Sequence, residues 1–455
     1  MAITTINPTT GRLEKTFSEI SKEELLAKIN SAELAYQSWR VTDFQFRKTK
    51  MLNAASILRS EKEIFGKLLT LEMGKTLAQA IGEVEKCAWV CEYYAENGEN
   101  ILQEEIIQTD ADKSYVRFDP LGVILAVMPW NFPFWQVFRF AAPSLMAGNT
   151  ALLKHASNVP QCALAIEDIF KQAGFPDNVF QTLLISSSMV DEVIQHPFVK
   201  AATLTGSEPA GKSVASACGK LLKKTVMELG GSDPFIILDD ADIQTAANVG
   251  VTARLINNGQ SCIAAKRFIV EEKVYDEFTK LFVGKMKSVK VGDPLQSETE
   301  LGPIAREDLL FDLLSQINKS VEAGAEVLCG GKRLEHSGYF LEPTVLTNVK
   351  KGMPAYHEEI FGPVAILIKA KDDHEAIRIA NDTEFGLGAS VWTKSKYRAE
   401  KFAKEIQAGS VFINGLVKSD PRLPFGGIKN SGYGRELSHY GIKEFVNIKT
   451  VWMKN

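Results

Sequence analysis

The sequence predicts an α/β protein built on parallel sheets, and three observations predict this class. Helical periodicity dominates residues 21–102, and short apolar strand candidates alternate with helices between about 121 and 231. A second block of the same kind runs from about 234 to 415. Strands that alternate with helices favour a doubly wound parallel sheet, which is the usual frame for a bound nucleotide. The 455 residues, 45% of them hydrophobic, are enough for two or three domains.

The helical first part opens at a recognisable N-terminal cap. Ser21 and Glu24 have the spacing of a capping box, in which each side chain accepts a hydrogen bond from the other residue's backbone N–H. The run 21–40 continues with helical periodicity, and two more helical runs follow before residue 103. The segment 114–120, "SYVRFDP", then predicts a strand.

The first alternating block contains four strand candidates before a short fifth one at "KTVMELGG". These four candidates are 121–130, 149–157, 179–186 and 199–207. The second block opens at "PFIILDDAD". The tail "FVNIKTVWMKN" alternates apolar and polar residues, and no strand is left in sequence to pair with it. We therefore expect an edge strand that pairs with another subunit of a homodimer or homotetramer.

Composition argues against several classes of protein. The 52 basic and 56 acidic residues leave a net charge of −4, so we expect no nucleic-acid partner and no membrane partner. The first residues, "MAITTINPTTGRLEKTF", lack the pattern of a signal peptide, and no window approaches the roughly 20 apolar residues of a membrane span. We expect a cytoplasmic protein.

Six cysteines are too few for a disulfide framework in a chain of this length. Cys87 and Cys91 have helical spacing, and we expect them to pack in a helix rather than bind zinc. No two of the six histidines have metal-ligand spacing, so no metal site is expected, and a cysteine–histidine hydrolase has no obvious pair.

The stretch "NNGQSCIAAKRF" places Cys262 behind two turn-prone residues, which raises the question of what a thiol does there. A nucleophilic cysteine needs a lowered pKa or a nearby base, and donors for the oxyanion that it creates. Asn131 in "PWNFP" is either an oxyanion donor or a turn residue. Glu228 in "VMELGGSDP" is either a general base with a raised pKa or part of a buried structural ion pair.

Other segments suggest a nucleotide. "TLTGSEPAGKS", with Gly206 and Gly211, leads from a strand into a helix, whose first N–H groups can bind a phosphate; the alternative is an ordinary strand–helix turn. Lys154 directly follows a strand, where a ribose or phosphate can lie. Glu359 and Phe361 occupy a loop bounded by glycine and proline.

The motifs "PWNFP", "TGSEPAG", "ELGGSDP", "GQSC", "EEIFGPV" and "PFGGIKNSGYGRE" stand in one order from about 129 to 436. Together they resemble the aldehyde dehydrogenase superfamily, and the wording of the C-terminal part is most similar to its short succinate-semialdehyde dehydrogenases. The resemblance implies a Rossmann-type cofactor domain, an α/β catalytic domain and a small β oligomerisation element. The expected ranges are 1–110 with 129–229, then 230–420, and 111–128 with 436–455.

The same resemblance implies a role for the thiol. Cys262 matches the nucleophile, Asn131 the oxyanion donor beside the backbone N–H of Cys262, and Glu228 the base that activates water. The thiolate attacks an aldehyde, a hydride passes to the cofactor, and the resulting thioester is hydrolysed. The positions that match cofactor contacts are Trp130, Lys154, Ser157, Gly206, Ser207, Gly211, Leu229, Glu359 and Phe361.

One position, Ser157, predicts which cofactor the protein prefers. The family often has a glutamate three residues after the strand-end lysine, where it binds the ribose hydroxyls and repels a 2′-phosphate. Ser157 stands there in this chain, next to the positive charge of Lys154. We therefore expect NADP to be preferred, with NAD as a weaker substitute.

Succinic semialdehyde is the expected substrate because a cation matches the family's carboxylate site. Arg139 and Ser419 match the substrate-carboxylate contacts, and Trp135 makes the pocket apolar. The alternative for Arg139 is an ion pair on a helix surface. Ile256 stands where many relatives have a second arginine, and Arg254 or Arg422 would have to compensate.

Three other interpretations remain open. The first is a broad-specificity enzyme for other aliphatic or aromatic aldehydes. The second is a non-catalytic binding protein, against which the intact Cys262, Asn131 and Glu228 argue. The third is a cysteine hydrolase that works without a cofactor.

Overall fold

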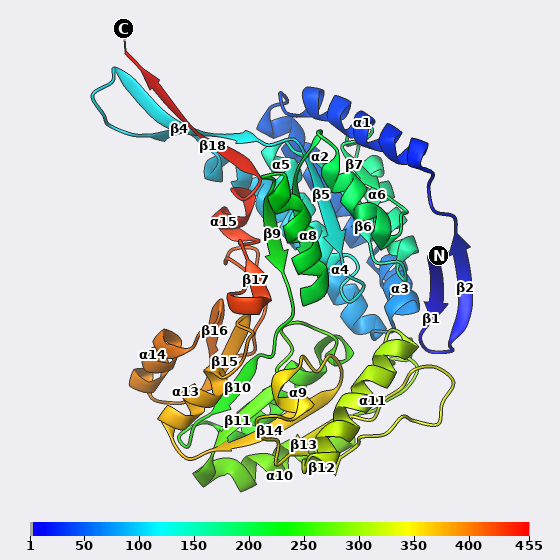
Figure 1. The fold of residues 1–455 in the computed structure, drawn as a ribbon, viewed down its shortest axis with the longest axis vertical. Coiled ribbons are helices and arrows are strands. Elements are labelled where there is room, and N and C mark those ends of the chain that lie inside the picture. The colour runs from blue at the N-terminus through cyan, green and yellow to red at the C-terminus, as the bar shows by residue number, and fades with distance from the viewer. Residues whose placement is uncertain (1–2, 455) are drawn as a thin grey trace.

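The computed structural model describes residues 3–454, which form two α/β domains and a thin projecting arm (Figure 1). Residues 1, 2 and 455, the outermost positions of the expected domain ranges, lie outside the described residues. One domain holds a six-stranded sheet and the other a seven-stranded sheet. The polypeptide crosses between the two after β9 (Lys224–Glu228) and returns at β17 (Gly432–Tyr433), so both crossings lie beside the same sheet edge.

The six-stranded sheet has the order β17-β9-β8-β5-β6-β7, and all neighbours are parallel except the β17–β9 pair. Its other strands are β5 (Val123–Met128), β6 (Thr150–His155), β7 (Phe180–Thr182) and β8 (Val199–Thr205). Its helices are α1 (Lys22–Trp39), α2 (Phe44–Ser60), α3 (Lys62–Met73), α4 (Leu77–Ile101), α5 (Trp135–Ala147), α6 (Pro160–Gln172), η1 (Ser187–Met189), α7 (Val190–Gln195) and α8 (Glu208–Lys220). The central strand β5 is a continuous apolar run and β6 is buried at every residue, as expected of a parallel sheet covered on both faces.

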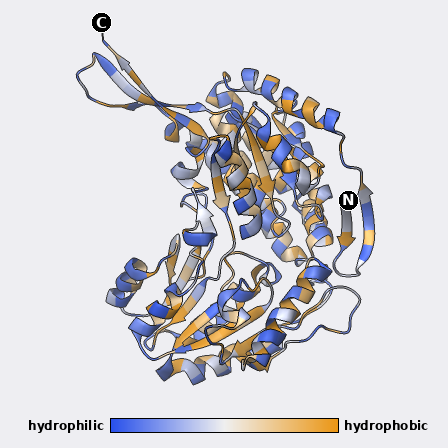
Figure 2. Cartoon of the chain, viewed as in Figure 1, coloured by the Kyte–Doolittle hydropathy of each residue, from blue (hydrophilic) through white to orange (hydrophobic). Residues whose placement is uncertain are grey.

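The seven-stranded sheet has the order β12-β13-β14-β11-β10-β15-β16, with β12 antiparallel at one edge. Its strands are β10 (Pro234–Ile237), β11 (Arg267–Glu271), β12 (Glu326–Cys329), β13 (Thr344–Thr347), β14 (Val364–Ala370), β15 (Gly388–Trp392) and β16 (Ser410–Ile413). Its helices are α9 (Ile243–Leu255), η2 (Ile256–Gly259), α10 (Glu272–Ser288), α11 (Glu307–Glu322), α12 (Pro354–His357), α13 (Asp373–Asn381) and α14 (Lys396–Glu405). Figure 2 shows apolar residues concentrated on the strands and on the helix faces that cover them.

The arm consists of β18 (Val446–Met453) and β4 (Lys113–Pro120), which pair antiparallel along all their residues. The short β3 (Glu105–Ile106) lies on the other side of β4. The tail was expected to pair with another subunit, because no strand in the sequence remained to pair with it. That expectation was incomplete. β18 pairs with β4 of its own chain, 326 or more positions earlier, as the pair Val446–Pro120 shows. The edge of β18 that faces away from β4 pairs with no strand among the described residues.

One domain boundary was predicted wrongly. The range 111–128 was expected in the oligomerisation element, but β5 (Val123–Met128) pairs with β6 and β8 at the centre of the six-stranded sheet. Nearly all residues of β5 are buried, whereas β4 consists mostly of exposed and partly buried residues. The arm therefore ends near Pro120 and the sheet begins at Val123.

Other local features agree with the sequence or add to it. The capping box of Ser21 and Glu24 is present at the start of α1. The hairpin of β1 (Ile3–Asn7) and β2 (Arg12–Phe17) was not predicted. Near the C-terminus lie two further short elements, η3 (Lys429–Ser431) and α15 (Ser438–Ile442).

Two kinds of feature are absent from the described residues. Between residues 3 and 454, no helix is both long and apolar enough to cross a membrane. No group of three or more His, Cys, Asp or Glu in that range is arranged to hold a metal ion. All six cysteines are free thiols.

Candidate active site

The turn before Cys262 has an unusual backbone. Asn257 and Asn258 both have φ of 57°, and Gly259 has φ of 76°, a region that side-chain-bearing residues rarely adopt. A Cβ atom on Gly259 would lie 2.4 Å from the backbone carbon of Gly362, so only glycine fits. The Asn258 side-chain amide donates to the carbonyl oxygen of Gly74 at 2.8 Å and holds the turn against the other domain.

Two buried cations hold the backbone on either side of the thiol. The Arg254 guanidinium donates to the carbonyl oxygen of Gly259 at 2.6 Å. The Lys266 ammonium donates to the carbonyl oxygens of Ser261 (2.9 Å) and Cys262 (2.8 Å). Satisfying carbonyl groups with buried donors makes a loop rigid, since breaking either contact leaves a polar group unpaired. Arg254, which was considered as a second substrate cation, is committed to this loop instead.

Cys262 lies where two cavities meet. One cavity encloses about 780 Å³ and is lined by residues from α4, α5 and the loop that holds Ser419. The other encloses about 700 Å³ and lies at the ends of β5, β8 and β9. Cys262 and Gln136 line both cavities. A thiol in this position can contact one ligand in each cavity.

The second cavity brings together most of the expected cofactor positions. It is lined by Pro129, Trp130, Asn131, Gln136, Thr205, Gly206, Ser207, Leu229, Gly230, Cys262, Leu309, Glu359 and Phe361. Trp130 and Phe361 meet edge to face with ring centres 5.8 Å apart. Glu359 accepts the backbone N–H of Gly231 at 3.0 Å and lies 3.4 Å from the Lys266 ammonium.

Three expected cofactor positions lie outside this cavity. Lys154 is buried at the end of β6, and burial lowers its pKa. Ser157 is exposed and lines a separate hollow that also contains Arg306, a residue that sequence reasoning missed. Gly211 lies inside α8, where a Cβ atom would come within 2.5 Å of the Leu229 side chain. Gly211 thus allows close packing of the helix on the strand end rather than lining the cavity.

The start of α8 fits a phosphate group. Gly206 and Ser207 line the cavity immediately before the helix, and the Ser207 side chain makes no capping hydrogen bond. The first N–H groups of a helix have no partner within the helix, so they remain available to an anion. Pro209 removes only one of these donors.

Asn131 is positioned beside the thiol by reciprocal contacts with the Cys262 loop. Its side-chain amide donates to the carbonyl oxygen of Gln260 at 3.1 Å, and its own carbonyl oxygen accepts from the Asn257 amide at 2.7 Å. It lines the same cavity as Cys262. One amide hydrogen is used in the contact with Gln260, and the second is free for a ligand oxygen.

Glu228 ends β9 in a buried position behind the cavities. Its side chain is 2% exposed, and both carboxylate oxygens lack a hydrogen-bond partner among residues 3–454. One oxygen lies 2.7 Å from where a Cβ atom on Gly426 would stand, so glycine provides the space. Burial raises the pKa of Glu228 well above its ordinary value, and nearby Arg139 acts in the opposite direction. Neither cavity is lined by Glu228, so its carboxylate must turn toward Cys262 to act on a ligand there.

The electrostatics around the thiol favour its protonated form. Burial raises the pKa of Cys262 to about 12, while the positive charges of Arg139 and Lys266 act to lower it. Glu359 and Asp233 raise it further. The thiol therefore needs a base or an added positive charge to become a thiolate at neutral pH.

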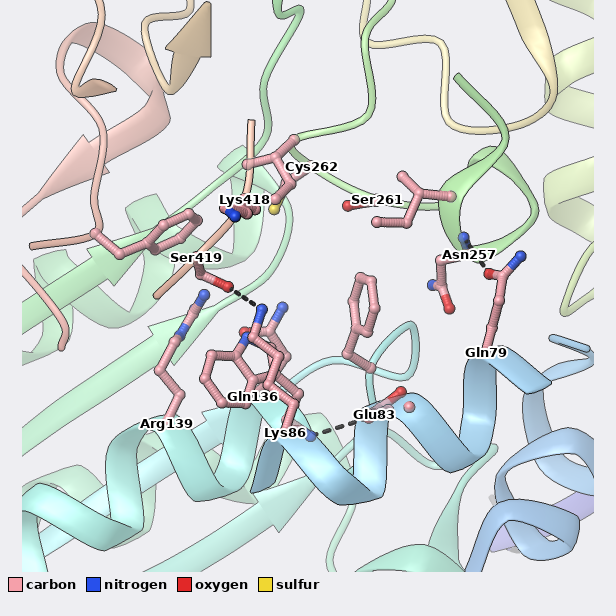
Figure 3. Close-up of a pocket in the computed structure, with 16 residues that line it drawn as sticks. Gln79, Glu83, Lys86, Gln136, Arg139, Asn257, Ser261, Cys262, Lys418 and Ser419 are labelled. Atoms are coloured by element: carbon pink, nitrogen blue, oxygen red, sulfur yellow. Dashed lines mark hydrogen bonds between the residues drawn. The ribbon is translucent and has the colours of Figure 1, made fainter. Parts of the chain in front are cut away.

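The first cavity contains the expected substrate residues. It is lined by Gln79, Gly82, Glu83, Lys86, Phe132, Trp135, Gln136, Arg139, Ile256, Asn257, Ser261, Cys262, Ile263, Lys418, Ser419 and Phe425. Figure 3 shows Cys262 on one side of this cavity and Arg139, Lys86 and Ser419 on another. Most of its lining surface is apolar because of the aromatic side chains.

Arg139 is not on a helix surface, so that alternative is wrong. Its side chain is 1% exposed, forms an ion pair with Glu436 and donates to the Thr205 hydroxyl at 3.2 Å. Its guanidinium also lies over the Phe425 ring, 4.6 Å from the ring centre. The pairing with Glu436 was not foreseen, because the two residues are far apart in sequence.

Lys86 is another residue that sequence reasoning missed. It comes from α4, and its ammonium donates to the Ser419 hydroxyl at 2.7 Å. The one feature of the sequence that could have indicated it is a lysine about one helical turn after Glu83, among residues of α4 that are mostly buried. Arg422, considered as a compensating cation, does not line the cavity and pairs with Asp420 at 2.6 Å.

Comparisons with known proteins identify the family of the chain. The chain matches the family model described as "Aldehyde dehydrogenase family" over residues 1–451. It is 54% identical over 453 residues to a Synechocystis sp. protein named "Probable succinate-semialdehyde dehydrogenase (NADP(+))", with both chains fully covered. A Mycobacterium tuberculosis protein named "Succinate-semialdehyde dehydrogenase (NADP(+)) 1" is 52% identical over 456 residues, again with full coverage.

Solved structures share the fold over the whole chain. The crystal structure of succinic semialdehyde dehydrogenase from Streptococcus pyogenes in complex with NADP+ has a TM-score of 0.98, 41% identity and full coverage of both chains. The fold class predicted from the sequence is thus confirmed. The family match and the full-length relatives show that the chain belongs to the aldehyde dehydrogenase family.

Proposed function

We propose that the protein oxidises succinic semialdehyde to succinate with NADP as the preferred cofactor. The observation that carries this proposal is that Cys262 lines both the cavity with the cradle for a phosphate and the cavity with the cations. A nucleophile shared by the two cavities can hold an aldehyde carbon next to a hydride acceptor. Full-length relatives at 52–54% identity, whose names include that substrate and NADP(+), support the choice of reaction.

The first step is addition of Cys262 to the aldehyde carbon. Because burial raises the pKa of the thiol, its proton must leave before or during the attack. The new oxyanion is stabilised by the free amide hydrogen of Asn131 and by the backbone N–H of Cys262. The nicotinamide ring, when bound, brings positive charge and accepts the hydride that leaves the thiohemiacetal carbon. What remains on Cys262 is a thioester.

The second step is hydrolysis of this thioester, and Glu228 is the base. The carboxylate turns from its buried position toward the cavity and takes a proton from water, which then attacks the thioester carbon. Because both Glu228 oxygens lack partners in the buried position, turning breaks no hydrogen bond within the described chain. Succinate leaves, and Cys262 regains its thiol.

Some residues that bind the cofactor line the second cavity, and others lie outside it. Gly206 and Ser207 at the start of α8 hold the phosphates, and Trp130, Glu359 and Phe361 surround the remainder. Lys154, at the end of β6, and Ser157, two residues beyond the strand, form the site of the 2′-phosphate, since neither repels a negative charge. The preference for NADP over NAD rests on these two positions.

A second candidate is a broad-specificity aldehyde dehydrogenase. It is favoured by the ion pair of Arg139 with Glu436, which reduces the positive charge available to a substrate carboxylate. Ile256 and the aromatic residues of the same cavity would suit a neutral aldehyde.

A grid of kcat/KM values separates the two candidates. Succinic semialdehyde, glutaric semialdehyde, butanal and benzaldehyde are each tested with NADP and with NAD by absorbance at 340 nm. We expect succinic semialdehyde with NADP to lead every other pair by tenfold or more. Equal values for butanal or benzaldehyde would favour the broad-specificity enzyme. The Cys262→Ala variant is the control, and it should bind cofactor without oxidising any aldehyde.

We also propose a homodimer or homotetramer that works in the cytoplasm. The arm carries exposed apolar residues, among them Ile448 and Trp452, and ends in a strand edge without a partner among residues 3–454. Such an edge is a surface on which a second copy of the chain can pair. The six free thiols agree with a reducing compartment.

A further inference from the structure

The substrate cavity contains a cation that no protein carboxylate neutralises. Lys86 and Arg139 come from the neighbouring helices α4 and α5, and Figure 3 shows both side chains directed toward Ser419. Arg139 is paired with Glu436. Lys86 forms no ion pair with any carboxylate among residues 3–454; its ammonium instead donates to Ser419 at 2.7 Å and lies 4.3 Å from the Trp135 ring centre.

The carboxylates nearest to Lys86 are committed elsewhere. Glu83, one turn earlier on α4, forms an ion pair with the buried Lys75 and accepts the backbone N–H groups of Phe134 and Trp135, each at 2.9 Å. Asp420 accepts from the guanidinium of Arg422 at 2.9 and 2.6 Å. No side chain in this part of the cavity can therefore supply the missing negative charge without breaking an existing pair.

The environment of Lys86 makes the absence of a negatively charged partner unfavourable in free energy. Burial, together with the positive charge of Arg139, lowers its pKa to about 8. Cys87 and Glu83 on its own helix, and Asp420 on the facing loop, act in the opposite direction without cancelling the effect. A partly buried cation without a counter-ion is stabilised by an anionic ligand, because the ligand replaces the lost hydration.

We infer that Lys86 supplies the positive charge that binds the distal carboxylate of the substrate, together with the hydroxyl of Ser419. Ile256, which lines the same cavity, is apolar and supplies no charge, so Lys86 provides from α4 the positive charge that Ile256 lacks. Arg139 remains beside the carboxylate site, but its charge is largely balanced by Glu436. This inference rests on the proposed function, and it makes Lys86 a determinant of specificity for acid-bearing aldehydes.

Lys418 provides a matched control. It lines the same cavity as Lys86, but its side chain is exposed, and Ser419 accepts from Lys86 rather than from Lys418. An exposed lysine contributes little to binding because water and salt screen its charge. Replacing each lysine by methionine removes the charge and keeps much of the side-chain length.

The test compares succinic semialdehyde with butanal, which has the same chain length and no carboxylate, using the complete enzyme and NADP. We expect Lys86→Met to lower kcat/KM for succinic semialdehyde about ten- to a hundredfold, mainly through KM, and to change the value for butanal less than about twofold. Lys418→Met should lower the value for succinic semialdehyde much less than Lys86→Met does, because water screens its charge. Lys86→Arg, which keeps the charge, should lose much less than Lys86→Met.

Inhibition by succinate gives a readout that does not depend on turnover of the aldehyde. The inhibition constant of succinate should rise about as much as KM in Lys86→Met. Equal losses for both aldehydes, or an equal effect of Lys418→Met, would overturn the inference. If the unmodified enzyme oxidises butanal as well as succinic semialdehyde, the proposed function itself fails. If it prefers succinic semialdehyde and Lys86→Met keeps that preference, only the role of Lys86 fails.

The unmodified enzyme also provides a test that needs no variant. The ratio of kcat/KM for succinic semialdehyde to that for butanal cancels the titration of Cys262 and Glu228, which both substrates share. Below its pKa of about 8, Lys86 carries its charge, and above that value it loses it. The ratio should therefore be constant near pH 7 and fall as the pH rises through about 8 to 9. A flat ratio up to pH 9.5 would contradict the inference.

Discussion

At the scale of single residues, Glu228 has the properties of a base that works only after it moves. It is buried beside Gly426, its pKa is raised well above the ordinary value, and its two oxygens have no hydrogen-bond partner within the described chain. A protonated carboxyl group can remain in such a place at low cost, but it cannot accept a proton from water. Contact with water in the cavity lowers the pKa and restores the base.

Replacing Glu228 by glutamine tests this assignment. We expect Glu228→Gln to lower steady-state turnover about 10²- to 10⁴-fold, because thioester hydrolysis loses its base. Hydride transfer precedes hydrolysis, so rapid mixing should still show a burst of reduced cofactor equal to the number of active sites. Loss of the burst along with turnover would place Glu228 in the first step instead. Glu277→Gln, at an exposed position on α10, serves as a control and should leave both phases unchanged within about twofold.

At the scale of elements, the turn from α9 to β11 places the thiol. Two asparagines and Gly259 adopt positive φ in succession, a conformation that costs free energy and persists only where the surroundings enforce it. The enforcing contacts come from Gly74 in one domain and Arg254 and Gly362 in the other. The position of Cys262 therefore depends on both domains being docked.

Gly259→Ala should be strongly destabilising. The left-handed backbone costs an alanine about 1–3 kcal/mol, and the clash with Gly362 adds to that cost. We expect a clear fall in the midpoint of urea unfolding and a change in the rate at which a thiol reagent labels Cys262. The control is Gly284→Ala in α10, where a Cβ atom meets nothing within 4 Å and alanine favours the helix by about 0.5–1 kcal/mol. Equal stability of the two variants would show that the turn is not strained.

At the scale of the whole molecule, the arm extends away from both domains (Figure 1). Ile448 is 60% exposed and Trp452 is 49% exposed, and their even spacing along β18 puts them on one face of the strand. An apolar face on a projecting ribbon gains little from its own chain. A second subunit that covers it would remove this surface from water.

Charges on that face should therefore break the assembly. We expect the double substitution of Ile448→Glu and Trp452→Glu to convert the proposed dimer or tetramer to a smaller species, measured by sedimentation velocity at several protein concentrations. Lys287→Glu, on the exposed side of α10, is the control and should leave the sedimentation coefficient unchanged. An unchanged oligomer in the arm variant would mean that another surface holds the subunits together.

Much of the fold could be predicted because its signals are local. The capping box of α1 depends on two residues three positions apart, and the apolar run of β5 depends on six consecutive residues. The domain to which β5 belongs was predicted wrongly. The sequence of a single apolar strand does not show which strands it pairs with. Only pairing with β6 and β8 decides that it belongs to the central sheet.

The sequence by itself determined the family, the order of the motifs and the residues that are candidates for nucleophile, oxyanion donor and base, because each lies within a short, characteristic string of neighbours. The tertiary structure alone decided that Arg139 pairs with Glu436, that Ser157 lies in a hollow apart from the cofactor cavity, and that Lys86 contacts Ser419 across 333 positions. The physical reason is that charge balance depends on which helices and loops pack together. Sequence spacing describes one element at a time, whereas the counter-ion of a buried charge comes from another element.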